Sequence, residues 1–166
     1  SAKEPMRFLG MGILSARRNR VPEAREAFDR ALRLAPRDEL ILREAGIFQY
    51  NMGDAGQARK LLETALRLDP DDYMGLFFYA RLLDDSGQSD KALQTYGKVL
   101  RHVPEDAEVH TYYGRSLGKN NQPFAGYLHL AYAALYSNDG RRADSWLDKA
   151  RPLAVTEAEK RDLTHF

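Results

Sequence analysis

Residues 24–36, 58–70 and 92–104 read AREAFDRALRLAP, ARKLLETALRLDP and ALQTYGKVLRHVP. Each segment ends in a proline, and consecutive prolines are 34 residues apart: Pro36, Pro70 and Pro104. Small and apolar residues stand at matching offsets before each proline. Self-similarity at this period predicts stacked pairs of helices, because each pair buries its apolar face only against its neighbours.

Apolar residues at helical spacing predict two helices in each unit. In the second unit they predict one helix from Asp38 to Asn51 and another from about Ala55 to Leu68, with Asp54 as the N-cap. The third unit repeats this scheme over residues 72–85 and up to His102, and Ser89 is predicted to cap its second helix. Proline after each second helix disfavours its continuation.

Small residues at fixed offsets predict where paired helices cross, because two helices approach closely only where side chains are short. These residues are Gly46, Ala80 and Gly114 on the first helices and Ala58 and Ala92 on the second. A larger residue at these positions is expected to overpack the crossing.

With these residues in place, the pattern resembles the tetratricopeptide repeat. Residues 5–38, 39–72 and 73–106 each supply most of the small, aromatic and proline positions of that family. The resemblance implies an all-α fold, a right-handed superhelical solenoid of antiparallel helix pairs with about four to five repeats plus a C-terminal capping helix. We expect residues 1–166 to form a single domain of this kind.

The repeat changes phase after Pro104, because no proline stands near position 138. A fourth unit is predicted over residues 107–138, starting with a helix from about Ala107 to Leu117. Residues 122–136 fit the second helix of that unit and also the first helix of an overlapping pair over residues 124–153, so we expect this helix to serve as both. Thr156 and Glu159 predict a capping box for a last helix over residues 156–165.

Similarity to this family implies that the first helices line a concave groove that binds a peptide or protein partner. Groove-facing side chains then come from fixed positions of each unit. In this sequence they are Arg43, Ile47, Tyr50, Asn51, Met74, Phe77, Arg81, Asp84, Thr111, Arg115 and Lys119. Aromatic rings and arginines are suitable anchors, because they combine large apolar area with forked hydrogen bonding. The same rings are also suited to packing inside the groove.

One subclass of the family is disfavoured. Its members bind a C-terminal carboxylate with lysine and asparagine at two groove positions, which here hold Leu9 and Ile13, Arg43 and Ile47, or Phe77 and Arg81.

No pattern of catalytic or metal-binding residues stands out, so we predict no enzymatic activity and no cofactor. The chain has no cysteine, and no pair of its four histidines has the spacing of a helical zinc site. It also has no GxSxG elbow and no glycine-rich phosphate loop. His129 lies in an apolar stretch and is predicted to be a packed or interface histidine.

Charge and hydropathy exclude two further kinds of partner. Residues 1–38 hold nine Lys/Arg against five Asp/Glu, but the whole chain carries only +1, and its basic residues lack interleaved aromatics, so nucleic-acid binding is not expected. No apolar run approaches the roughly 20 residues that span a bilayer, so no direct membrane insertion is expected.

A narrower similarity covers residues 107–163, which resemble the repeat array that follows the catalytic domain in some bacterial zinc metallopeptidases of the HExxH type. The resemblance implies a role in handling substrates or docking on an assembly complex at the cell envelope, in the periplasm. Without it, the absence of cysteine fits the cytoplasm equally. Ser1 and Ala2 look like a cleavage or cloning remnant, which predicts that the sequence is part of a longer protein.

A structural alternative is a self-assembling scaffold without a peptide ligand. In this hypothesis the aromatic helix that contains Tyr127, Tyr132 and Tyr136 packs against another copy and forms a homo-oligomer.

Overall fold

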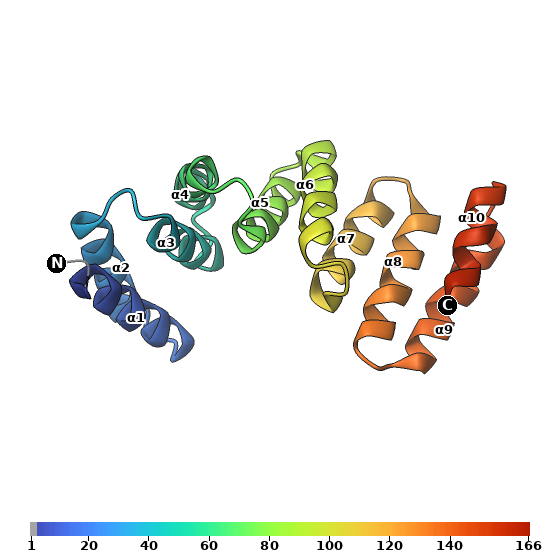
Figure 1. Ribbon diagram of the computed structural model, residues 1–166, viewed down its shortest axis with the longest axis horizontal. Helices are drawn as coiled ribbons and strands as arrows, with labels where there is room; N and C mark the ends of the chain where they lie inside the picture. The colour runs from blue at the N-terminus through green and yellow to red at the C-terminus, as the bar shows by residue number, and fades with distance from the viewer. Residues whose placement is uncertain (1–2) are drawn as a thin grey trace. The chain divides into compact units, whose positions relative to one another are not determined.

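The computed structural model describes residues 3–166, which form ten α-helices and two short 3₁₀ helices, with no strand among these residues (Figure 1). Ser1 and Ala2, the predicted remnant, lie outside the described residues. In chain order the elements are α1 Lys3–Arg17, α2 Val21–Leu34, α3 Glu39–Asn51, α4 Ala55–Leu68, α5 Tyr73–Asp85, α6 Ser89–His102, α7 Ala107–Lys119, α8 Pro123–Tyr136, α9 Gly140–Ala150, η1 Arg151–Leu153, α10 Glu157–Asp162 and η2 Leu163–His165. They divide into two compact parts, one ending at Leu82 and the other comprising Leu83–Phe166. From here on, these two parts are called the first unit and the second unit, and the 34-residue segments are called repeats.

Most predicted helix boundaries are confirmed. Asp38 and Asp54 cap α3 and α4, and each carboxylate accepts a hydrogen bond from the backbone N–H three residues ahead. The capping box of Thr156 and Glu159 is present at the start of α10. The last two segments are less regular than predicted, since α9 and α10 each end in a 3₁₀ turn.

The prediction that Ser89 caps α6 is wrong. Gln88 occupies the N-cap position without a side-chain hydrogen bond, and Ser89 is the first residue of the helix. The repeat itself explains the difference, because the position equivalent to Asp54 one period later is 88.

A residue with a left-handed backbone conformation follows the first helix of each repeat, and this feature recurs with the same 34-residue period. The residues with positive φ at these turns are Asn19, Gly53, Gly87 and Asn121. Glycine and asparagine are the residues that adopt this conformation at least cost, and helices commonly end this way. The next helix begins two residues later in every case.

The phase change after Pro104 is visible in the same feature. Asn138 stands where a fourth proline would fall, and it has φ of 60° like the residues that end first helices. Thus α8 starts like a second helix, two residues after Asn121, and ends like a first helix, two residues before Asn138. It packs against both α7 and α9, which lie on either side of it in antiparallel orientation, so the expected double role is confirmed (Figure 1).

The core of the first unit lies among α1, α2 and α3. It includes Phe8, Phe28 and Phe48, and the rings of Phe28 and Phe48 are 5.1 Å apart. Gly12 allows α1 to approach α2, because a methyl group there would lie 3.1 Å from the Phe28 ring. Gly46 does the same between α3 and α4, where the methyl would lie 2.9 Å from Cγ of Leu62.

The core of the second unit includes Phe124, Leu128 and Leu147, with Leu163 of η2 packed against it. The helices α7 and α8 cross at two glycines. A methyl group on Gly114 would lie 2.8 Å from the carbonyl oxygen of Gly126, and one on Gly126 would lie 2.9 Å from that of Gly114. Both contacts involve backbone atoms, which cannot rotate away as a side chain can.

We expect Gly114→Ala to lower the free energy of unfolding by about 1–3 kcal/mol, the usual cost of overpacking. The matched control is Gly118→Ala on the same helix, where a methyl group meets nothing within 4 Å. That change is expected to stabilise by up to about 1 kcal/mol through helix propensity. Urea denaturation followed by circular dichroism measures both, and equal effects of the two substitutions would contradict the close crossing.

Candidate functional site

The predicted groove residues of the first unit lie on α3 and α5, and they differ in exposure. Asn51 and Met74 are exposed, Met74 by 42%. Ile47 and Phe77 are buried, with 9% and 7% exposure, and belong to the packed interior. Any ligand on this surface would meet the exposed pair first.

Arg81 lies against three aromatic rings of the first unit. Its guanidinium carbon is 5.1 Å from the ring centre of Tyr50, 5.6 Å from that of Phe77 and 5.1 Å from that of Phe78. Phe78 in turn contacts Tyr50 and Phe77 edge-on. Cation–π contacts hold the arginine over these rings, so the four side chains form one packed group.

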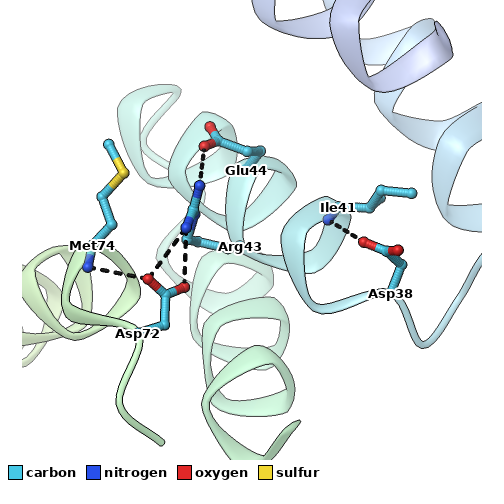
Figure 2. Close-up of polar contacts among 6 residues, drawn as sticks. All are labelled: Asp38, Ile41, Arg43, Glu44, Asp72 and Met74. Atoms are coloured by element: carbon cyan, nitrogen blue, oxygen red, sulfur yellow. Dashed lines mark hydrogen bonds and ion pairs between the residues drawn. The ribbon is translucent and has the colours of Figure 1, made fainter. Parts of the chain in front are cut away.

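Arg43 joins α3 to the start of α5. Its Nη1 lies 3.2 Å and 3.3 Å from the two carboxylate oxygens of Asp72, and its Nη2 donates to Glu44 at 2.9 Å (Figure 2). Asp72 directly precedes α5 and also accepts a hydrogen bond from the backbone N–H of Met74. The side chain of Arg43 is only 18% exposed, so the structure places it in an internal ion network.

Glu39 adds a third carboxyl group to this network. Burial, together with a hydrogen bond to Asp72 and its negative charge, raises the pKa of Glu39 from 4.5 to about 8. Burial acts on Asp72 too, but the hydrogen bond from Glu39 and the charge of Arg43 outweigh it and hold the pKa of Asp72 below its usual range. At neutral pH, therefore, Glu39 is protonated and donates to the Asp72 carboxylate.

The predicted groove residues of the second unit are more accessible. Thr111, Arg115 and Lys119 lie on α7, with Thr111 partly buried and the other two exposed. Lys119 donates to Asp84 at 3.1 Å, and the Asp84 side chain is 11% exposed. These two residues satisfy one another, whereas no described residue forms an ion pair with Arg115.

Two cavities open on α7, α8 and α9, and they share Arg115 and Leu130. The first has a volume of about 450 Å³ and is also lined by Thr111, Ala134, Arg142 and Trp146. The second has a volume of about 580 Å³ and extends past Lys119 to Tyr127. We call the first cavity, whose lining also includes Ala133, Ser137 and Asp139, the α7–α9 groove.

Sequence reasoning found only Thr111 and Arg115 of this groove. Leu130, Ala134, Arg142 and Trp146 were missed, because the family positions were applied to first helices only. The absent proline at position 138 was the available signal: it indicates that the chain turns early, and the turn at Asn138 places α9 beside α8.

A histidine pair lies inside the second unit. The Nδ1 atoms of His110 and His129 are 2.9 Å apart, and Nε2 of His110 donates to the carbonyl oxygen of Pro104 at 2.8 Å. His110 therefore accepts at Nδ1, and His129 donates from its own Nδ1. Burial, and then the neighbouring His110, lower the pKa of His129 to about 4. The packed histidine predicted at position 129 is present.

The three tyrosines of the self-assembly hypothesis also pack within the second unit. Tyr127 stacks on Trp146 at 5.8 Å, Tyr132 lies 4.5 Å from the Phe166 ring, and Tyr136 lies 5.4 Å from the His110 ring. Their rings are thus engaged by their own chain.

Within residues 3–166, no group of three or more histidine, cysteine or acidic side chains is arranged to hold a metal ion. In the same part of the chain, no helix is long and apolar enough to cross a bilayer.

Comparison with known proteins assigns the repeat. Residues 49–115, which include all of α4, α5 and α6, match the family profile described as tetratricopeptide repeat. This part of the chain consists of tetratricopeptide repeat sequence. Such repeats are generally non-catalytic interaction modules, which agrees with the absence of catalytic motifs from the sequence. No curated protein gives a significant match to the sequence.

Solved structures share the tetratricopeptide repeat fold. MamA from residue 41 to its end, from Desulfovibrio magneticus RS-1, is 20% identical with a TM-score of 0.68, and the match covers 90% of this chain and 94% of that one. YrrB, a tetratricopeptide repeat protein with an unusual peptide-binding site, is 19% identical with a TM-score of 0.71 over 87% and 75%. A chain of the APC/C hetero-tetramer Cut9–Hcn1 is 20% identical with a TM-score of 0.79 over 88% and 29%. At these identities the likeness concerns the fold.

The Glu39 carboxyl predicts a pH-dependent stability. Because its pKa is higher in the folded chain than in the unfolded one, its stabilising contribution is complete below pH 4.5 and is lost as the pH rises to about 8. Glu39→Gln keeps a hydrogen-bond donor toward Asp72 but cannot ionise. We expect the variant to gain stability relative to wild type as the pH rises from 5 to 8, measured by urea denaturation. A constant difference across this range would contradict the shifted pKa.

His129 predicts the opposite dependence at lower pH. Its contribution is complete above pH 6.5 and is lost as the pH falls to about 4, because the unfolded chain binds the proton more readily. In His129→Gln this loss is absent, so the stability difference between wild type and variant should shrink between pH 6.5 and 4. Thermal melts across this range measure it, and parallel curves would rule out the titration.

Proposed function

We propose that this chain is a non-catalytic interaction module that binds a peptide or protein segment on the exposed surface of its first helices and of α8 and α9. The observation that carries the proposal is the α7–α9 groove, where an exposed arginine, a tryptophan and a cavity of about 450 Å³ occur together. Arginine and tryptophan are enriched among residues that dominate protein interfaces.

The fold supports the same function. Stacked helix pairs present extended surfaces that other tetratricopeptide repeat proteins use for partners. YrrB has a peptide-binding site, and Cut9 belongs to a hetero-tetramer. The resemblance of residues 107–163 to the repeats of envelope metallopeptidases extends the proposal to a partner class, namely envelope substrates or an assembly complex.

In the first unit, the surface available to a partner is narrower than the groove positions indicate. Arg43 is held by Asp72 and Glu44, and Phe77 is buried. We therefore assign contact in this unit to Asn51 and Met74, whereas Tyr50 and Arg81 belong to the packed group of rings.

The test is a selection of peptides from a random displayed library on the whole chain, followed by mapping of the winning peptides with backbone amide NMR. We expect shifts at groove positions of the unit that the peptide contacts, such as Asn51 and Met74 in the first unit or Thr111 and Arg115 in the second. Exposed positions on second helices, Lys60 of α4 and Lys91 of α6, serve as internal controls and should not shift.

A footprint confined to α4 and α6 would overturn the proposal. Failure to select any peptide, together with a molar mass above that of one chain that persists on dilution in light scattering, would favour the self-assembling scaffold. The tyrosine rings of α8 would then have to leave their present packing.

A further inference from the structure

The α7–α9 groove contains a pair of arginines from different helices. Arg115 of α7 and Arg142 of α9 are both exposed and line the same cavity. No described residue forms an ion pair with either of them. The guanidinium of Arg115 is 6.0 Å from the Tyr112 ring, which leaves its forked donors available.

One carboxylate, that of Asp139, also lines the cavity. It is the N-cap of α9, and its Oδ1 accepts from the backbone N–H of Arg142 at 3.1 Å. Two arginines and one aspartate leave the lining with an excess of one positive charge. An anionic group that entered would meet two unpaired guanidinium groups and one carboxylate already bound to a helix N-terminus.

Four apolar residues line the cavity, and we call them its apolar floor: Leu130, Ala133, Ala134 and Trp146. Ala133 and Ala134 are buried, whereas Leu130 and Trp146 are partly buried. Trp146 stacks on Tyr127. Lys149 contacts both rings of this stack, with its Nζ 4.8 Å from the centre of the Trp146 ring and 6.0 Å from that of Tyr127.

We propose that the α7–α9 groove is a subsite for an acidic peptide segment, in which a glutamate or aspartate lies between Arg115 and Arg142 and an adjacent apolar residue lies on Leu130 and Trp146. The inference rests on the proposed function and specifies its partner chemistry. Arginine forks bind carboxylates through two parallel hydrogen bonds, which accounts for the charged half of the segment. The apolar floor accounts for the other half.

A nucleic acid fits this surface less well than an acidic peptide. Affinity for a polyanion comes from many cations that follow the phosphates, and here two arginines line the cavity together with one aspartate. The apolar floor is formed by alanine and leucine, and a carboxylate beside an apolar side chain matches both features.

The probe is a short blocked peptide in which Glu and Asp residues flank a Leu-Phe pair, labelled with fluorescein and titrated with the whole chain. The reference peptide replaces each Glu by Gln and each Asp by Asn. We expect the acidic peptide to bind at least about tenfold more tightly, since a charge-assisted hydrogen bond contributes enough for a factor of this size. The preference should weaken as salt is added.

Arg115→Gln and Arg142→Gln are each expected to weaken binding of the acidic peptide about tenfold and to leave the reference peptide unchanged. The matched control is Arg141→Gln, an exposed arginine next to Arg142 that does not line the cavity, and it should bind like wild type. All three arginines are exposed, so loss of folding does not complicate the comparison, and circular dichroism checks this.

Equal affinity for the two peptides, no saturable binding of either at millimolar concentration, or full affinity in both arginine variants would overturn the acidic subsite. A single-stranded oligonucleotide that competes with the same dependence on Arg115 and Arg142 would also overturn it, in favour of nucleic acid. If both peptides bind equally and their NMR footprint lies on the groove, the subsite fails while the proposed function stands. If the footprint lies on α4 and α6, the proposed function fails as well.

Discussion

Close helix crossing at small side chains is the constraint on which both units depend. Where α7 meets α8, two glycines bring backbone atoms within contact distance, and at Gly46 a leucine of α4 fills the space that a side chain would take. Ala58, Ala65, Ala92 and Ala131 are completely buried for the same reason. This constraint explains the 34-residue period of the sequence, because each helix crossing needs a small residue at the equivalent position of its helix.

The local parts of the fold were predictable because short-range rules govern them. Asp54 caps α4 as expected, since a carboxylate directly after Gly53 reaches the free N–H groups of the first turn. The same rule applied to Ser89 gave the wrong residue, because the cap position is set by the left-handed turn residue Gly87 and falls on Gln88. The start of this helix is therefore determined by the repeat register rather than by the intrinsic capping preference of one side chain.

The candidate site was less predictable. A groove position in the repeat fixes where a residue lies on its helix, but it does not say whether neighbouring side chains bind or bury that residue. Arg43 stands at such a position, yet Asp72, which directly precedes α5, engages it. Phe77 stands at another, yet it is buried. In the second unit, two of the residues that sequence reasoning missed, Arg142 and Trp146, belong to α9, whose placement follows from the half-period turn at Asn138. Only the three-dimensional packing shows which side chains of α9 line the same cavity as those of α7.

The arginines of the two units therefore have different roles. In the first unit, Arg43 stabilises the junction of α3 with α5, and Arg81 is held over aromatic rings, so both positive charges contribute to the packing of their own unit. In the second unit, Arg115 and Arg142 line a cavity without a carboxylate partner among the described residues. An exposed arginine contributes little to stability where it stands. Its guanidinium keeps its full hydrogen-bonding capacity for a carboxylate brought from outside, and this is why the groove of the second unit is the surface on which an acidic partner can be recognised.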